Sequence, residues 1–143
     1  MNFPILSSLI LLPSIGALFI LLSKSKDQSN YQSSKYVALF VSFANFFISL
    51  YLWYIFDPNI TDFQFVENRS WLPGFINYKV GIDGISILFI VLSTLITPLC
   101  IVSVNKSVNT KLKEFLIAIL LMESLMIGVF CSIDLVIFYL FFE

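Results

Sequence analysis

Long apolar runs are the feature that most constrains how this chain can fold. About 20 apolar residues in α-helical form cross the hydrocarbon core of a bilayer. Runs of this length occupy residues 3–22, 36–56, 85–104 and 115–132. A fifth run starts at Asp134 and stops at Glu143, the last residue. Because a helix satisfies its own backbone in lipid, we predict an all-α transmembrane fold with four full helices and an incomplete fifth over 134–143.

Composition supports a membrane protein and excludes several other classes. Hydrophobic residues make up 59% of the 143 residues and charged residues 12%, whereas soluble domains have roughly 45–50% and about 25%. The chain has no histidine, which excludes histidine metal ligands, catalytic triads and imidazole relays. A net charge of −1 gives no reason to expect a nucleic-acid partner. Cys100 and Cys131 lie in apolar runs, and we interpret them as small buried residues.

The first run has the position of a secretory signal peptide but not its pattern. No basic residue precedes it, and its length exceeds the apolar region of about 7–15 residues that signal peptides contain. We therefore interpret residues 3–22 as a transmembrane helix, with a signal peptide as the alternative.

Basic residues in the connections predict the orientation. Six lysines follow the first and third runs or precede the next ones: Lys24, Lys26, Lys35, Lys106, Lys111 and Lys113. The connection over 57–84 carries only Arg69 and Lys79. Because loops rich in Lys and Arg stay on the cytoplasmic or matrix side, we predict an outer N-terminus and an outer extramembrane loop over 57–84. A loop this long is expected to be ordered by other subunits or later helices.

Small polar residues recur at helical spacing within two of the runs. They are Ser42, Asn45 and Ser49 in the second run, and Ser86, Ser93, Thr97 and Cys100 in the third. Such residues let membrane helices approach closely and share hydrogen bonds, so we interpret both faces as packing surfaces. Pro98 is expected to kink or loosen its helix.

Two aspartates stand where helices are expected to begin. Asp83 lies just before the third run, and Asp134 opens the fifth. A carboxylate there can accept hydrogen bonds from the free N–H groups of the first turn. We predict that both cap helices, and we keep both as candidate supporting residues of a membrane site.

Glu123 and Glu143 are expected at similar depth in the membrane. At about 1.5 Å per residue, Glu123 lies roughly 14 Å beyond Glu114, and Glu143 roughly 14 Å beyond Asp134. Both distances reach about the middle of a 30 Å hydrocarbon core. The short connection between the last two runs predicts antiparallel neighbours. Tyr139 lies one helical turn before Glu143, where it could donate a hydrogen bond to the carboxylate.

Ionisable residues at this depth are functional candidates by default, because each ionised group costs several kcal/mol. We therefore predict that Glu123 and Glu143 belong to a proton pathway. The alternative is a pair of protonated glutamates that only join helices by hydrogen bonds.

Several motifs together resemble one family. They are Val80-Gly-Ile-Asp-Gly-Ile-Ser86, Trp71-Leu-Pro-Gly, Lys113-Glu-Phe, Met122-Glu-Ser, Ile127-Gly-Val-Phe, and the run from Asp134 to Glu143. The set is similar to the antiporter-like membrane subunits of proton-pumping NADH:quinone oxidoreductase, respiratory complex I. Within that family it resembles the branch called subunit M in bacteria and subunit 4 in mitochondria.

The resemblance implies roles for residues and for the chain. Glu143 matches the proton-channel glutamate of helix five, and Glu123 matches the acidic residue of helix four. Family members have about fourteen transmembrane helices built around inverted repeats, so the chain would be the N-terminal portion of such a subunit. It would lie in a bacterial plasma membrane or mitochondrial inner membrane, among other complex I membrane subunits and lipid, with protons as the transported species.

The resemblance leaves the redox chemistry to other subunits. No cofactor is expected in this chain, because NADH, flavin, iron–sulfur clusters and quinone would be handled elsewhere in the complex. The family's helix-five glutamate works against a lysine on a later helix, and no lysine lies within an apolar run here. The alternatives are a truncated or decayed copy, or a small membrane scaffold or assembly protein without transport activity.

Overall fold

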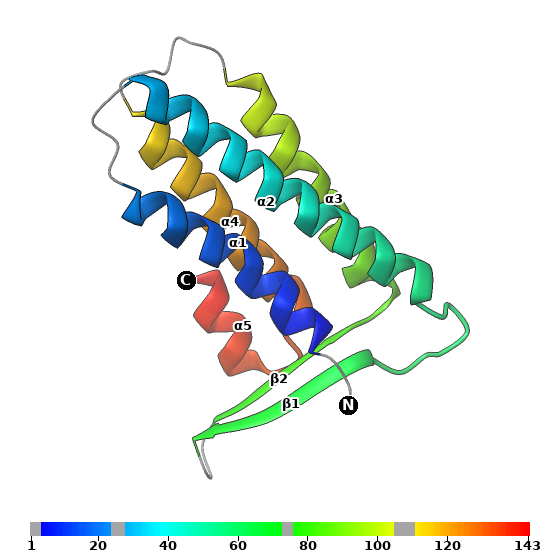
Figure 1. The fold of residues 1–143 in the computed structure, drawn as a ribbon. Coiled ribbons are helices and arrows are strands. Elements are labelled where there is room, and N and C mark those ends of the chain that lie inside the picture. Colours follow the sequence, from blue (N-terminus) through cyan, green and yellow to red (C-terminus); the bar gives the residue numbers. More distant parts are fainter. Residues whose placement is uncertain (1–3, 24–27, 73–75, 105–110) are drawn as a thin grey trace.

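Helices form most of the structure, a computed structural model that describes residues 4–23, 28–72, 76–104 and 111–143. The elements in chain order are α1 (Ile5–Leu22), α2 (Gln28–Ile55), β1 (Gln64–Leu72), β2 (Ile76–Ile82), α3 (Gly84–Ser103), α4 (Leu112–Cys131) and α5 (Leu135–Phe142). Figure 1 shows α1 to α4 as an elongated bundle with the shorter α5 beside α4. Among the described residues, four helices are long and apolar enough to cross a membrane. The predicted fold of four spans and a short fifth helix is confirmed.

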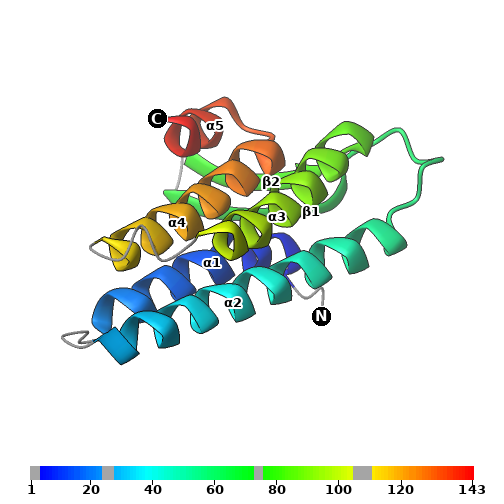
Figure 2. The same ribbon diagram turned by 90° about the horizontal axis from the view of Figure 1, so that it is seen from above.

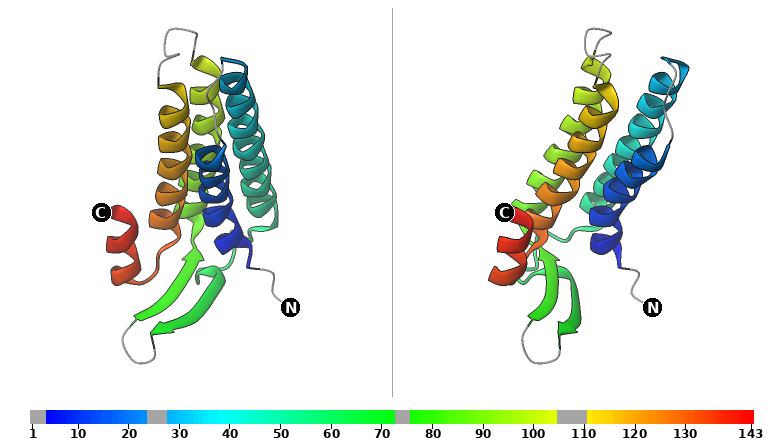
Figure 3. Two further views of the ribbon diagram at one scale, coloured as in Figure 1. Left: turned by 60° about the vertical axis from the view of Figure 1, so that its left-hand side comes forward. Right: turned by 90° about the vertical axis from the view of Figure 1, so that its left-hand side faces the viewer.

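The bundle has two layers. Figures 2 and 3 show α1 and α2 on one side, with α3, α4 and α5 on the other. Close packing needs small residues at particular points. A Cβ on Gly128 of α4 would lie 2.6 Å from the ring of Phe141 on α5, and one on Gly16 of α1 would lie 2.8 Å from Val41 on α2. These glycines therefore set how closely α5 approaches α4 and α2 approaches α1.

Two apolar clusters fill the interior, one towards each end of the bundle. The cluster at the hairpin end consists of Leu6, Leu9, Ile10, Leu52, Val80, Ile82, Ile87, Ile90, Ile127 and Cys131. The cluster at the opposite end consists of Ala17, Ile20, Ala38, Ile101, Leu112, Leu116 and Leu120. In each of the four long helices, a stretch of sequence separates the residues of the two clusters. Those stretches hold the buried polar residues described below.

The connection over 57–84, predicted as an extramembrane loop, contains a β-hairpin. Strands β1 and β2 pair antiparallel, with Asn68 opposite Lys79 and Arg69 opposite Tyr78. The hairpin lies across the end of the bundle where α1, α3 and α5 begin (Figure 1). Ile133 donates a backbone hydrogen bond of 3.2 Å to the Lys79 carbonyl. Contacts within the chain itself therefore support this segment.

Acidic side chains bind the helix N-termini at the hairpin end. Asp83 accepts a hydrogen bond of 2.7 Å from the Ser86 amide, and Asp134 accepts one of 2.8 Å from the Val136 amide. The capping predicted for both aspartates is confirmed. Glu67 of β1 accepts hydrogen bonds from the Leu6 amide at 2.8 Å and from the Ser7 amide and hydroxyl. This residue, which lies about sixty positions away in sequence, caps α1.

Lysines bind helix C-termini at the opposite end. Lys35 Nζ donates to the Val104 carbonyl at the end of α3, at 2.8 Å. Lys113 Nζ donates to the Leu21 carbonyl at the end of α1, at 3.1 Å. The helix dipole places partial negative charge at the C-terminus and partial positive charge at the N-terminus. A cation at the first and a carboxylate at the second are therefore both stabilising. Charges of opposite sign thus stabilise the two ends of the bundle.

Some boundaries and burial states differ from the predictions. Helix α2 begins at Gln28, eight residues before the apolar run over 36–56, because a helix can extend into polar sequence beyond the membrane. Cys131 is buried, but Cys100 is exposed on the outer face of α3, so its predicted burial is wrong within this chain. Lys24, Lys26, Lys106 and residues 73–75 of the Trp71 motif lie outside the described residues.

Candidate functional site: a polar layer in the middle of the bundle

A layer of polar side chains lies between the two apolar clusters, and all four long helices contribute to it. We call it the polar layer. Its members are Ser14 of α1, Asn45 and Ser49 of α2, Thr94 and Thr97 of α3, and Glu123 and Ser124 of α4. All except the half-buried Ser14 are buried. Buried polar groups in a membrane-spanning bundle need partners within the protein, so their contacts define what the layer can do.

Glu123 and Asn45 form the central contact. Asn45 Nδ2 donates a hydrogen bond of 2.8 Å to Glu123 Oε1. Asn45 is fully buried and Glu123 is 3% exposed. The amide oxygen Asn45 Oδ1 and the second carboxyl oxygen Glu123 Oε2 are both buried without a hydrogen-bond partner among the described residues. The predicted site residue Glu123 therefore lies in the interior, between α2 and α4, with half of its carboxyl group unpaired.

Hydroxyl groups connect the remaining helices of the layer. Ser124 donates to the Ile10 carbonyl of α1 at 2.6 Å and lies 2.7 Å from the Ser14 hydroxyl. Ser49 of α2 lies 2.7 Å from the Thr94 hydroxyl of α3. These bonds join α1 to α4 and α2 to α3. The packing role predicted for the polar face of α2 therefore holds at Ser49, whereas Asn45 contacts an ionisable group.

Glu143 lies at the end of α5 and is exposed. Its amide donates a backbone hydrogen bond of 3.0 Å to the Tyr139 carbonyl. The Tyr139 side chain is exposed, and among the described residues its hydroxyl makes no hydrogen bond to Glu143, unlike the contact suggested by their spacing. Because α5 runs antiparallel to α4 and Phe141 lies against Gly128, Glu143 is within about one helical turn of the level of Glu123.

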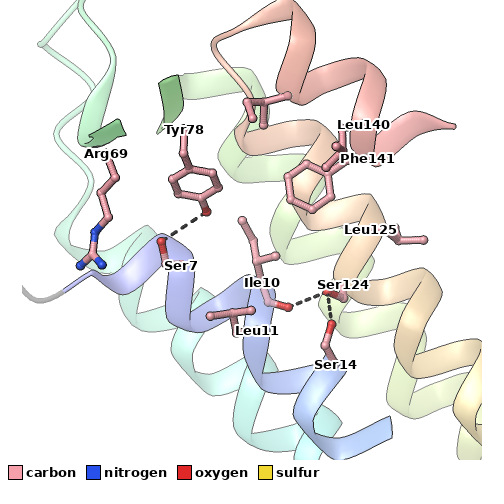
Figure 4. Close-up of a pocket in the computed structure, with 11 residues that line it drawn as sticks. Ser7, Ile10, Leu11, Ser14, Arg69, Tyr78, Ser124, Leu125, Leu140 and Phe141 are labelled. Atoms are coloured by element: carbon pink, nitrogen blue, oxygen red, sulfur yellow. Dashed lines mark hydrogen bonds between the residues drawn. The ribbon is translucent and has the colours of Figure 1, made fainter. Parts of the chain in front are cut away.

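A cavity of about 550 Å³ lies beside the layer, between α1, α4, α5 and the hairpin (Figure 4). Ser14 and Ser124 line it on the side of the polar layer, and Ser7, Arg69 and Tyr78 line it at the hairpin end. Burial raises the pKa of the Tyr78 hydroxyl above its ordinary value. Neither Glu123 nor Glu143 is among the residues that line this cavity. Among the described residues that line the cavity, Ser14 and Ser124 are thus the members of the polar layer.

The two capping aspartates take no part in the layer. Asp83 and Asp134 lie at the hairpin end, where each binds the first turn of its own helix. The Ser86 amide holds the pKa of Asp83 below its usual value, because it binds the charged carboxylate. Both carboxylates thus cap their own helices. The structure brings neither of them close to Glu123 or Glu143.

Sequence reasoning found Glu123 but not all of its surroundings. A charge inside an apolar run identifies the glutamate, whereas its partner Asn45 is 78 positions away. Nothing in the local sequence of α2 distinguishes a packing asparagine from one that binds a carboxyl group. The spacing in α3 likewise predicts a polar face through Ser93 and Thr97, whereas Thr94 makes the contact with α2.

The fold and the polar layer define a class of protein. A bundle of four helices long and apolar enough to span a membrane defines an integral multi-pass membrane protein. The carboxyl group in its interior is a candidate functional site. No family model matches the chain.

Similarity to known proteins narrows the class. The chain is 45% identical to NADH-ubiquinone oxidoreductase chain 4 of Marchantia polymorpha over 96% of its own residues and 28% of that protein. It is 45% identical to NADH-quinone oxidoreductase subunit M of Rhodobacter capsulatus over 97% and 27%. For subunit M of Rickettsia prowazekii the identity is 41% over 100% and 29%.

The family resemblance found in the motifs is therefore confirmed. Over nearly its whole length the chain is homologous to part of a complex I subunit. That subunit is named subunit M in the NADH-quinone oxidoreductases and chain 4 in the NADH-ubiquinone oxidoreductase. It spans less than a third of the length of the curated relatives that it matches.

Proposed function

We propose that this chain is the N-terminal piece of a proton-translocating membrane subunit of NADH:quinone oxidoreductase. The observation that carries the proposal is the position of Glu123. Its carboxyl group is buried among membrane-spanning helices, with Asn45 as its hydrogen-bond partner and one oxygen unpaired. A buried ionisable group with an unpaired oxygen lowers the stability of the folded chain. Its presence at this position therefore supports a role in proton transfer.

In this proposal, Glu123 and Glu143 bind and release protons within the membrane. Charges interact strongly where the dielectric constant is low. A charge that moves near either carboxyl group therefore changes how readily that group holds a proton. The similar level of the two groups on adjacent antiparallel helices supports their assignment to one pathway. The lysine of this pathway would lie on a later helix of the complete subunit.

The same proposal assigns the redox chemistry to other subunits. NADH, flavin, iron–sulfur clusters and quinone would be bound elsewhere in the complex, and this chain would contribute only to the proton pathway. Its partners would be other membrane subunits and the surrounding lipid. The exposed apolar faces of α1 to α4 support such surroundings, because large side chains such as Leu22, Phe40 and Leu99 point away from the bundle.

The test is a substitution of Glu123 by glutamine in the complete subunit, assembled in its complex. Glu123→Gln keeps the shape and the hydrogen-bonding capacity but cannot ionise. Proton pumping, measured by dye-reported acidification of vesicles, should fall several-fold. NADH oxidation with an artificial electron acceptor should be unchanged. Glu114→Gln, at the exposed start of the same helix, should pump normally.

A scaffold without transport activity is the second candidate. The hydrogen bonds that join the helices in the polar layer favour it, because such bonds are a common means of helix association. Normal pumping by the Glu123→Gln complex would support this candidate and would leave Glu123 with a packing role only.

A further inference from the structure

The contact between Asn45 and Glu123 is incomplete in a chemically specific way. One hydrogen bond joins Nδ2 to Oε1 at 2.8 Å. The two atoms that have no partner in the described part of the chain, Asn45 Oδ1 and Glu123 Oε2, are both hydrogen-bond acceptors. Neither can satisfy the other as long as the glutamate is ionised. The pair therefore lacks one hydrogen, and protonation of the carboxyl group would supply it.

An asparagine side chain suits both forms of a carboxyl group. Its amide has a donor and an acceptor in one plane, and a carboxylic acid has the same combination. A protonated Glu123 can therefore accept from Nδ2 at one oxygen and donate from the other to Oδ1, which closes a ring of two hydrogen bonds. An ionised Glu123 keeps only the first bond. Because a buried acceptor without a partner costs free energy, the second hydrogen bond favours the protonated form.

We propose that Asn45 is a positioning residue that binds Glu123 in both protonation states and forms a second hydrogen bond when the glutamate takes up a proton. The step is H⁺ plus carboxylate to carboxylic acid, with the proton delivered along the transport pathway. The proposal rests on the proposed function for its consequence in transport. The pairing itself is a property of this chain and can be measured without transport.

Neighbouring polar groups do not compete for this role. Ser42 donates to the Leu39 carbonyl at 3.1 Å within its own helix. Ser49 donates to the Phe46 carbonyl at 2.8 Å and contacts Thr94. Ser124, beside Glu123 in sequence, is bonded to α1. Asn45 is therefore the polar side chain that the structure places on the carboxyl group.

Infrared difference spectroscopy of the complete subunit, assembled in its complex, tests the pairing. The C=O stretch of a protonated carboxyl group reports its hydrogen bonds, and the band that disappears in Glu123→Gln is that of Glu123. In Asn45→Leu this band should shift to higher wavenumber, as expected for a carboxylic acid that has lost two bonds. Ser42→Ala, a change on the same face of α2, should leave the band in place. If the leucine variant does not fold, Asn45→Ala replaces it, and the Glu123 band should again shift to higher wavenumber.

Two results would overturn the proposal. One is a Glu123 band at the same position with and without the Asn45 amide. The other is the absence of any protonated Glu123 band in the unmodified complex across the titration from acid to neutral pH. Either result is distinct from failure of the proposed function, which is judged by proton pumping in the Glu123→Gln complex.

Discussion

Single residues in this chain are held by hydrogen bonds that reach across the bundle. Glu123 on α4 is bonded to α2, Ser124 is bonded to α1, and Ser49 of α2 contacts α3. Each bond joins two helices that are remote in sequence. A hydropathy pattern can reveal that a polar residue lies within an apolar run, but the identity of its partner depends on how the helices pack.

Asp83 gives a residue-scale prediction about stability. Its carboxylate binds the first turn of α3 at the Ser86 amide, so Asp83→Ala should lower the free energy of unfolding by about 1 kcal/mol, the usual cost of losing an N-cap. Asp83→Asn, which keeps an oxygen acceptor, should retain most of it. Denaturant unfolding in mild detergent at neutral pH measures both variants against the unmodified chain.

The same cap predicts a pH dependence. The pKa of Asp83 is lower in the folded chain than its ordinary value of 3.8. Its contribution is therefore complete above that value and is lost as pH falls through the folded-state pKa. The stability difference between the unmodified chain and Asp83→Ala should shrink in acid. A difference that grows as pH falls would contradict this assignment.

At the scale of elements, the helices follow from the sequence and the hairpin does not. Four apolar runs indicate four helices because each is long enough to span a bilayer and too apolar for water. Strands β1 and β2 have no such signal, since Glu67, Arg69 and Lys79 interrupt them. Their pairing depends on contacts with α1 and with the connection between α4 and α5, which only the folded chain provides.

Glu67 gives an element-scale prediction about how the hairpin is attached. It binds the Leu6 and Ser7 amides at the start of α1. Glu67→Ala should therefore cost about 1–2 kcal/mol, as for a helix cap, and should increase hydrogen exchange at those two amides. Asn68→Ala changes the next, exposed residue of β1 and should do neither. Unchanged exchange at Leu6 and Ser7 in Glu67→Ala would show that α1 does not depend on the hairpin.

The whole molecule is electrically asymmetric. Carboxylates cap helices at the hairpin end, and Lys35 and Lys113 bind helix C-termini at the other. Lys35 and Lys113 thus lie at the end opposite the hairpin, and the side of the membrane that each end faces stays a prediction from charge.

Labelling of single cysteines tests this orientation. With Cys100 and Cys131 replaced, Ser29→Cys should react with a membrane-impermeant reagent from the cytoplasmic or matrix side only. Asn59→Cys, between α2 and β1, should react from the outer side only. Reaction of the Ser29 variant from outside would reverse the orientation.

The central claim is that Glu123 and Glu143 serve one proton pathway, and a double-mutant cycle on pumping tests it most directly. Residues that act as a unit show strongly non-additive effects. In the assembled complex, Glu123→Gln and Glu143→Gln should each reduce the protons pumped per NADH oxidised, and the double variant should be no worse than the more severe single one. Normal pumping by Glu143→Gln, or single effects that multiply in the double variant, would contradict a shared pathway.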